Sequence, residues 1–364
     1  MQTDIFIAGA GLSGLALATA LKQANTPFLL ADIRDRVGGR ILSVDSSHDS
    51  QAATVADMGP SWIWPGQPRI AALLERLGID VFEQYSKGLL VYEDESGQIR
   101  RDLDYSTMAG SLRVKDGLGR LTRDLATQLP DESIHLSHRV ICVRRQQDGY
   151  EIDLQHPAGE LTVQANKVVL AIPPRVIAER IDFDPPLAEK VMQDLNATPT
   201  WMAGHAKIFA LYERPFWRDA GLSGDGISRR GPLMEIHDAS ANGSDCGALF
   251  GFVGIPANSP ARSRRRLLDD ATKQLERMFG PALADPLDVM LKDWAEDSAT
   301  ATAADNATIS HPHYGMPSSI AALADQGLLF ASTEMASQFG GFIEGALEAS
   351  ETALQQLNIK GVSS

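Results

Sequence analysis

The pattern of apolar and polar residues predicts a strand, a helix and a second strand at the amino terminus. Residues 5–8 form a short apolar run that predicts a buried strand, and residues 12–24 carry the apolar stripe of a helix. Asn25 can end this helix, and Pro27 cannot continue it. Residues 28–31 are apolar again, so we expect another strand there.

Residues 204–217, GHAKIFALYERPFW, predict a strand that contains a lysine. Alternate residues share a face, so one face carries His205, Lys207, Phe209 and Leu211, and the other carries Ala206, Ile208, Ala210 and Tyr212. Both faces are largely apolar, which predicts a strand covered on both sides. A buried ammonium is costly unless it is paired or loses its proton. The pattern alone therefore favours a Lys207 that keeps its amine in water at the strand end.

Two further segments have clear boundaries. The segment PRIAALLERLGID, residues 68–80, predicts a helix that ends at Gly78. The segment DGYEIDLQHPAGELTV, residues 148–163, predicts a hairpin that turns at 157–159.

Composition excludes several classes of protein. The chain has 364 residues, of which 44% are hydrophobic and 22% charged, as in an ordinary globular protein of one large or two smaller domains. Its net charge of −14 argues against a nucleic-acid partner. The two cysteines, Cys142 and Cys246, give neither a disulfide framework nor a metal signature. No basic region precedes the first apolar run, and no stretch is long enough to span a membrane, so we expect a soluble cytoplasmic protein.

The glycine turn at the amino terminus predicts a dinucleotide site. Gly9, Gly11 and Gly14 give G-x-G-x-x-G between the first strand and the helix. The first glycine permits the tight turn, the second lets the backbone approach a pyrophosphate, and the third lets helix and strand pack closely. The helix N-terminus favours phosphates. Asp32 lies at the offset where a carboxylate accepts from ribose hydroxyls, which argues against NADP.

The segment that follows distinguishes between dinucleotides. Residues 34–40, RDRVGGR, offer two more glycines for a close backbone approach and Arg40 to neutralise a phosphate. With this segment the chain resembles the flavin-containing amine oxidase family, and within it a short, soluble member of bacterial type. In this family, residues at these positions wrap the pyrophosphate of FAD.

The resemblance continues to the carboxyl terminus in family order. DMGPSWIW (57–64) looks like the segment beside the flavin ring, HRVICVRR (138–145) like the strand against the adenine, and KVVLAIPP (167–174) like the strand that follows. GLLFASTEMASQFGGFIEGALEAS (327–350) resembles the closing FAD motif. In it Glu334 is expected near the ribose and phosphate. A helix that starts near Gly341 should point its N-terminus at the flavin pyrimidine, where it would stabilise negative charge.

The resemblance implies a set of cofactor-binding residues. They are Gly9, Gly11, Leu12, Ser13, Gly14, Asp32, Ile33, Arg34, Gly39, Arg40, Gly59, Pro60, Ser61, Trp62, Val140, Pro173, Trp294, Ser332, Glu334, Gly341, Phe342 and Ile343.

The resemblance also changes the interpretation of the lysine. The family's strand ending in PFW carries a lysine at the place of Lys207, which holds a water beside flavin N5. We therefore expect Lys207 to face the flavin. Phe342 stands where one of two tyrosines of monoamine oxidases sandwiches the substrate amine, and its ring can still face an amine. Lys207 and Phe342 are the expected catalytic residues.

Several departures from the family bear on cofactor attachment and substrate. The segment after Trp294 contains no cysteine, so we expect non-covalent FAD. The second tyrosine of the cage falls around Ala303 or Ala304, which leaves Trp62, His313 or Tyr314 as candidates for that wall. Trp62 also occupies the place of the arginine that pairs with the carboxylate in L-amino acid oxidases, so amino acids are less expected substrates.

The expected fold class is α/β, with an FAD-binding Rossmann-like domain of glutathione reductase type and a discontinuous α+β substrate domain. Residues 1–64, 112–197 and 285–364 are expected to form the FAD domain, and residues 65–111 and 198–284 the substrate domain. The chain is shorter than typical relatives between PSWIWP and DGLG, so the cavity is either more open or closed by a second subunit in a homodimer.

Three functions remain open at this point. The leading one is oxidation of an amine C–N bond to an imine, with hydride or its equivalent passing to flavin N5, dioxygen as acceptor and hydrogen peroxide as product. The alternatives are a desaturase or dehydrogenase of carbon–carbon bonds or a non-redox isomerase on the same fold, and a non-enzymatic FAD-binding scaffold. No metal is expected.

Overall fold

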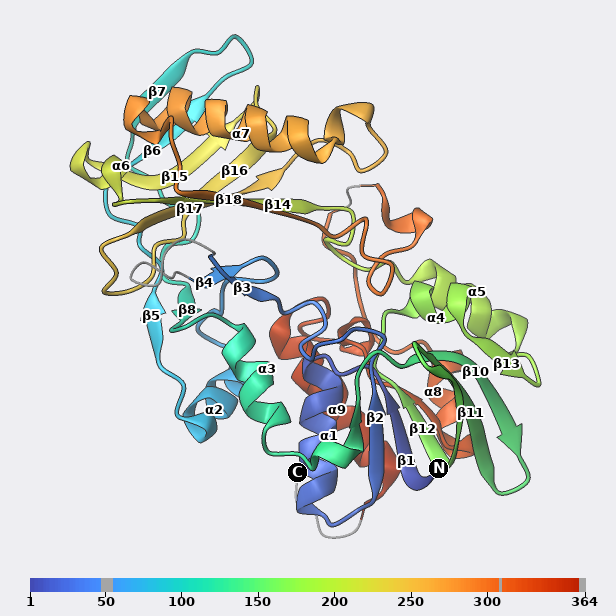
Figure 1. Cartoon of the computed structure of the whole chain (residues 1–364). Helices are drawn as coiled ribbons and strands as arrows, with labels where there is room; N and C mark the ends of the chain where they lie inside the picture. Colours follow the sequence, from blue (N-terminus) through green and yellow to red (C-terminus); the bar gives the residue numbers. More distant parts are fainter. Residues whose placement is uncertain (47–54, 308–309, 360–364) are drawn as a thin grey trace.

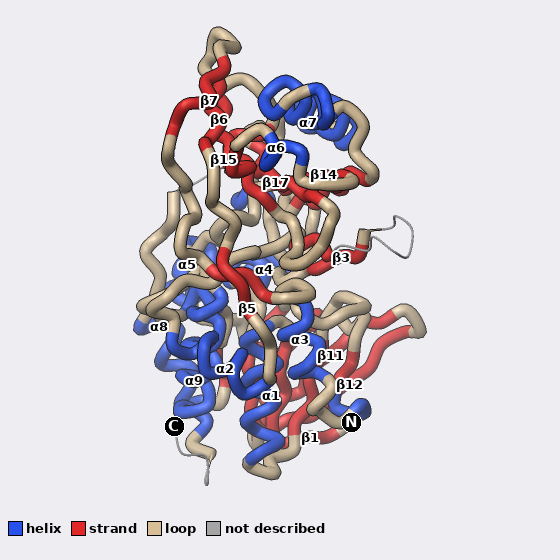
Figure 2. Tube along the Cα trace, turned by 90° about the vertical axis from the view of Figure 1, so that its left-hand side faces the viewer, coloured by secondary structure: helices blue, strands red, loops and turns tan. Residues whose placement is uncertain are grey.

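Two large β-sheets form the opposite ends of the molecule. The computed structural model describes residues 1–46, 55–307 and 310–359. Figure 1 shows one sheet beside both termini and the other at the far end of the chain's fold. Figure 2, turned by a right angle, shows the same elongated arrangement, with β5 (Val81–Glu83) between the two parts.

The first sheet combines a parallel core with an antiparallel meander. Its order is β13 (Asp182–Asp184), β10 (Arg139–Gln146), β11 (Gly149–His156), β12 (Gly159–Leu170), β1 (Gln2–Ala8), β2 (Phe28–Ala31) and β9 (Ile134–His135), and β19 (Leu328–Phe330) also pairs with β12. β1 runs parallel to both β2 and β12, while β10, β11 and β12 are antiparallel to their neighbours in the meander.

Each face of this sheet is covered by helices because β1 is apolar on both sides. Ile5 and Ile7 belong to one core and Phe6 and Ala8 to another, as the period of a strand requires. The first core includes residues of α1 (Leu12–Gln23), α2 (Pro68–Leu77), α3 (Gly119–Ala126) and α9 (Ile343–Leu357). The second includes residues of α4 (Pro174–Arg180), α5 (Glu189–Ala197) and α8 (Ser318–Ala321).

The second sheet is mostly antiparallel. Its order is β18 (Asp288–Asp293), β14 (Ala206–Tyr212), β17 (Gly247–Val253), β16 (Leu233–Asp238), β15 (Leu222–Ser228), β6 (Leu89–Glu93) and β7 (Ile99–Leu103). α7 (Arg264–Phe279) packs along its outer face (Figure 1). Every residue of β14 is buried: Ile208 and Ala210 contact the α7 side, and Phe209 and Leu211 contact the side that faces the first sheet. The expectation of a strand covered on both faces is confirmed.

Short elements connect the two parts. β3 (Ser43–Asp45) pairs with β4 (Val55–Asp57), and β5 pairs with β8 (Leu112–Val114). α6 (Phe216–Asp219) follows β14. The described 3₁₀ turns are Asp131–Ser133, Pro260–Arg262, Pro281–Leu283, Ala303–Asp305, Ala322–Gln326 and Thr333–Met335.

Several local predictions are confirmed. The first strand–helix–strand unit, the helix that ends at Gly78 and the hairpin with His156 opposite Gly159 are all present. Two segments pack differently from the expected domain boundaries. α2, expected in the substrate domain, contributes Ile70 and Leu73 to the core under α1. β18, expected in the FAD domain, extends the second sheet beside β14 because its residues pair with that strand. The remaining boundaries stay predictions.

In the part of the chain that the structure describes, no helix combines the length and apolar character needed to cross a membrane.

Candidate active site

The glycine turn between β1 and α1 is shaped by close backbone contacts. Gly9 has φ +105°, and a Cβ there would lie 2.6 Å from the Ala171 carbonyl oxygen. A Cβ on Gly14 would lie 2.0 Å from the Gly9 oxygen, so only glycine lets α1 start this close to β1. Gly11 differs, because a Cβ there would meet nothing within 4 Å. The backbone at Gly11 therefore faces open space, as a pyrophosphate site requires.

Asp32 follows β2 and points its carboxylate at the same space. It is 5% exposed and accepts hydrogen bonds from the backbone N–H groups of Ala10 and Arg34, both at 2.8 Å. The Arg34 guanidinium lies 2.7 Å from the Asp297 carboxylate and 3.9 Å from that of Asp32. Since these contacts use part of the carboxylate's acceptor capacity, the rest can accept from ribose hydroxyls. Ile33, next in the chain, is 36% exposed and does not line the cavity described below.

The second glycine pair lies against the first turn. Gly38 bridges to Gly11, and a Cβ on Gly39, which has φ +57°, would lie 3.2 Å from the Gly11 Cα. Arg40 comes next and forms an ion pair of 2.5 Å with Glu334, whose side chain is fully buried. Burial lowers the pKa of Arg40, but Glu334 outweighs it and leaves the pKa above its usual value. A cationic group is thus fixed beside the glycine backbone.

These features border one cavity of about 590 Å³ that runs between the two sheets. The expected cofactor residues that line it are Gly9, Gly11, Leu12, Ser13, Asp32, Arg34, Gly39, Arg40, Gly59, Pro60, Ser61, Trp62, Pro173, Trp294, Ser332, Gly341, Phe342 and Ile343. Gly14, Ile33, Val140 and Glu334 are not among the lining residues: Gly14 and Glu334 lie behind it, and Val140 packs in the core under the first sheet.

The cavity fits FAD on observations of this chain. The open side of Gly11 and the acceptor on Asp32 suit a pyrophosphate and a ribose. The buried hydroxyl of Ser332 has no hydrogen-bond partner, although it lines the cavity. A buried polar group without a partner is costly, which indicates a site for a polar ligand. Neither cysteine lines the cavity, as non-covalent FAD requires.

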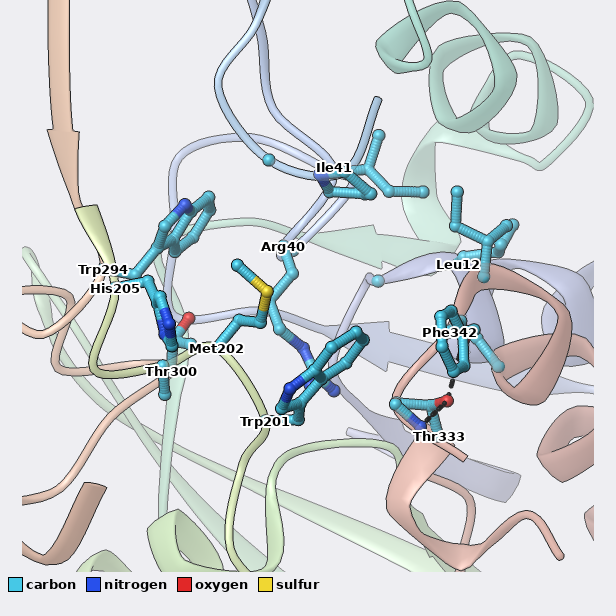
Figure 3. A pocket seen from close by; sticks show the side chains of 18 of the residues that line it. Leu12, Arg40, Ile41, Trp201, Met202, His205, Trp294, Thr300, Thr333 and Phe342 are labelled. Carbon is cyan, nitrogen blue, oxygen red and sulfur yellow. Dashed lines mark hydrogen bonds between the residues drawn. The ribbon is translucent and has the colours of Figure 1, made fainter. Parts of the chain in front are cut away.

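The start of α9 forms another part of the wall. Phe342 is the N-cap residue, and Gly341 before it has φ +84°. The Thr333 hydroxyl accepts from the Gly341 N–H at 3.0 Å and donates to the Phe342 carbonyl at 2.9 Å (Figure 3). The Thr333 side chain therefore fixes the backbone that presents the Phe342 ring and the free N–H groups of the helix.

Lys207, on β14, also lines this cavity. Its amine donates to the Asp57 carbonyl at 2.5 Å, the Gly59 carbonyl at 3.1 Å and the Ser61 hydroxyl at 2.6 Å. It also lies 3.8 Å from the centroid of the Phe250 ring. The side chain is buried and does not reach solvent. Burial lowers the pKa of Lys207 to about 7, against the opposing attraction of Asp57. The amine can therefore exist uncharged near neutral pH.

An aromatic cluster surrounds Phe342. The Trp201 ring lies 5.0 Å from it, His311 5.1 Å and Trp64 6.0 Å, between centroids. Figure 3 shows Trp201 and Phe342 next to each other at the cavity. The rings that contact Phe342 are thus Trp201, His311 and Trp64, and the second wall of a substrate cage stays a prediction.

The expected candidates for that wall have different roles. Trp62 packs on Phe250 and His237, at 5.2 and 4.8 Å, although it also borders the cavity. The Tyr314 hydroxyl donates to the Pro199 carbonyl and accepts from the Trp201 N–H, so it positions Trp201. Sequence reasoning missed Trp201. The available signal was an aromatic residue six positions before Lys207, on the turn that leads into β14.

No group of three or more His, Cys, Asp or Glu side chains suited to a metal ion occurs among the described residues.

Comparison with known proteins places this geometry in a family. The family model described as flavin containing amine oxidoreductase matches residues 12–91 and 82–358, which together cover most of the chain. Among curated proteins, putrescine oxidase of Kocuria rosea is 24% identical over 83% of this chain and 85% of its own length. The flavin-containing amine oxidase B of Sus scrofa is 23% identical over 98% of this chain and 86% of its own length.

Solved structures show the same fold. Putrescine oxidase bound to putrescine superposes with a TM-score of 0.79 at 21% identity, covering 98% of this chain and 99% of that one. Cyclohexylamine oxidase from Brevibacterium oxydans IH-35A superposes with a TM-score of 0.76 at 18% identity, with the same coverage. The chain is an FAD-dependent oxidoreductase and belongs to the flavin-containing amine oxidoreductase family.

Proposed function

We propose that this enzyme oxidises the C–N bond of an amine to an imine, with dioxygen as the electron acceptor. Two electrons and two protons leave the amine, and dioxygen takes them up as hydrogen peroxide. Water then hydrolyses the imine to a carbonyl compound and ammonia or a smaller amine. Bound FAD supplies the two-electron acceptor chemistry, and the chain supplies binding, orientation and a dry site.

The observation that carries this proposal is that Lys207, Phe342 and Trp201 line one cavity. The Lys207 amine is held between β14 and the segment 57–61 by the Asp57 carbonyl and the Ser61 hydroxyl, and the Phe342 and Trp201 rings pack together. The two rings pack against each other and together present aromatic faces to an amine in the cavity. We assign Phe342 and Trp201 to orienting the substrate, and Lys207 to holding a water beside the reacting atoms.

The same cavity gives each part of FAD a place. We assign the turn at Gly9 and Gly11 to the pyrophosphate and Asp32 to the ribose, because these groups face the open space described above. The start of α9 would stabilise negative charge on the flavin during reduction.

Relatives named for amine substrates favour this reaction over the carbon–carbon desaturase or isomerase alternatives. The cytoplasmic location and the homodimer stay predictions. Light scattering of the purified protein in solution gives its mass and tests the homodimer.

Substitution of Lys207 tests the proposal. Lys207→Met should slow anaerobic flavin reduction by an amine on the order of 100-fold, the lower end of the range in which positioned proton-transfer groups contribute. Bound FAD, measured by its absorbance against protein, should not change. Lys167→Met is the matched control, because Lys167 also donates to a backbone carbonyl, that of Leu357, and does not line the cavity. Equal reduction rates in both variants would refute the role of Lys207.

A further inference from the structure

A carboxylate shares a row with Lys207 on the cavity side of the second sheet. Lys207 of β14 stands opposite Phe252 of β17, and Phe252 stands opposite Glu235 of β16. Residues directly opposite across neighbouring strands point to the same face. All three line the cavity. Strands lie about 4.8 Å apart, so the backbones at Lys207 and Glu235 are separated by two such spacings, about 10 Å.

Glu235 is held by a buried imidazole. The Glu235 carboxylate lies 3.1 Å from Nε2 of His237, and Nδ1 of His237 lies 3.1 Å from the carboxylate of Asp225. Asp225 also accepts from the Ser106 hydroxyl at 2.6 Å. His237 is fully buried, and Trp62 and Phe250 pack on its ring. The imidazole cannot turn freely, so it fixes the direction of the Glu235 carboxylate.

The cluster of Glu235, His237 and Asp225 presents negative charge to the cavity. Burial lowers the pKa of His237, but hydrogen bonds to Asp225 and Glu235 outweigh burial and leave the pKa above its usual value. Two carboxylates flank one imidazole, so the group carries a net negative charge whether or not the ring is protonated. Asp225 is buried, whereas the Glu235 side chain is 37% exposed. Excess negative charge is therefore presented where a ligand can meet it.

Glu235 differs from the other acidic residue that lines the cavity in the described part of the chain. Asp32 lies in the turn assigned to the ribose and has the Arg34 guanidinium within 3.9 Å. The described ion pairs give Glu235 no arginine or lysine partner. Met234, Phe252 and Val253, which are apolar, line the cavity along with it. A carboxylate in apolar surroundings with one fixed donor has acceptor capacity left for a cation.

We propose that Glu235 binds a second positive charge on the substrate, so that the enzyme selects diamines or longer polyamines over monoamines, with His237 and Asp225 as positioning residues. This inference rests on the proposed function, because it takes the reacting amine to lie near Lys207 and Phe342. The apolar wall between the two positions, formed by Phe252, suits the methylene chain that joins the two nitrogens.

Binding and turnover experiments on the FAD-loaded enzyme test this together. Anaerobic flavin reduction is measured with linear diamines and monoamines of matched chain length. Calorimetry measures binding of a bis-quaternary alkyl diammonium ion against the mono-quaternary ion of the same chain, neither of which can form an imine. The variants are Glu235→Gln and, as the control for the same change of charge, Glu160→Gln in the exposed part of β12.

We expect Glu235→Gln to weaken diamine and diammonium binding at least tenfold and to leave the monoamine and the mono-quaternary ion unchanged. His237→Gln, which keeps a side-chain donor, should lower the preference for diamines by less. Glu160→Gln should behave as wild type. The inference is overturned if Glu235→Gln weakens binding of the diamine and the monoamine equally, and of the two quaternary ions equally, or if it changes none of them. If the dication binds through Glu235 but no amine reduces the flavin, the cation subsite stands and the proposed function fails.

Discussion

Lys207 is an amine enclosed by aromatic rings and backbone carbonyls. Its three oxygen acceptors and the Phe250 ring favour the charged form, while burial favours the neutral form and lowers the pKa to about 7. At the scale of the residue, protonation of this one amine should therefore appear in the stability of the whole protein.

The free energy of unfolding should rise with pH relative to the Lys207→Met variant. Between about pH 7 and the ordinary lysine value of 10.5, the unfolded chain keeps the proton and the folded chain has lost it. Stability rises wherever the unfolded state binds more protons, here by up to about 1.4 kcal/mol per pH unit. Below about pH 7 the lysine is protonated in both the folded and the unfolded state, so the difference in free energy of unfolding between wild type and Lys207→Met should be constant. Urea unfolding of both proteins between about pH 6 and about pH 10 measures this difference. A difference that stays constant above about pH 7 as well would contradict the prediction.

Lys207 and Trp201 show what sequence could and could not predict about single residues. The burial of β14 followed from apolar residues on both of its faces, and the structure agrees. The same pattern favoured a Lys207 amine in water, which is wrong, because the side chain is buried. The position of Trp201 could not be predicted, because its turn is fixed by the Tyr314 hydroxyl, 113 residues further along the chain. The pattern within a segment carries no information about such a distant partner.

At the scale of elements, α9 orders the segments around it. The fully buried Glu344 accepts from the backbone N–H groups of Arg69 and Ile70, at 3.1 and 2.9 Å, and so caps the start of α2. Glu348 accepts from the N–H of Ser337 at 2.8 Å, in the segment that leads to Phe342. One helix therefore anchors both a neighbouring helix and a loop of the site.

Glu344→Ala should destabilise the protein by about 1–3 kcal/mol, because it leaves two N–H groups at the start of α2 without a partner. The Arg69 guanidinium, 3.3 Å from the same carboxylate, also loses a partner. The midpoint of urea unfolding measures the loss. Glu351→Ala is the control, since Glu351 pairs with Arg69 at the surface and caps nothing. A Glu344 variant as stable as this control would disprove the capping role.

Elements with a strong local pattern were predictable, and those defined by partners were not. α1, α2 and the hairpin of β11 and β12 follow from apolar periodicity and turn residues. β18 joins the second sheet through its pairing with β14, although it lies near the segments of the first sheet in the chain. Pairing between distant strands depends on the fold as a whole, so its place was assigned wrongly from chain order.

At the scale of the whole molecule, the cavity lies between two sheets, each with its own core. A ligand that contacts both walls, such as FAD with a substrate, links the two parts. The location of this cavity was predictable from the glycine turn and the resemblance of the closing segment. Trp62, Trp294 and Phe342 of its aromatic lining were expected, but Trp201 was not, because the distant Tyr314 hydroxyl positions its turn.

FAD should therefore stabilise the native protein and leave it on denaturation. A ligand present at a hundred times its dissociation constant adds about 2.7 kcal/mol, so thermal unfolding of the apoprotein should occur several degrees lower. Acid precipitation should leave all of the FAD in the supernatant. Flavin that stays with the precipitated protein would show a covalent link, and equal unfolding temperatures would show that FAD does not bridge the two parts.

The most direct test of the account is anaerobic reduction of the bound flavin by a panel of monoamines, diamines and polyamines, with amino acids as controls. We expect the flavin absorbance to bleach with one class of amine and not with amino acids, and admitted dioxygen to restore the colour and produce hydrogen peroxide. A flavin that dithionite reduces but that no amine bleaches would contradict amine oxidation and favour a desaturase or isomerase on the same fold.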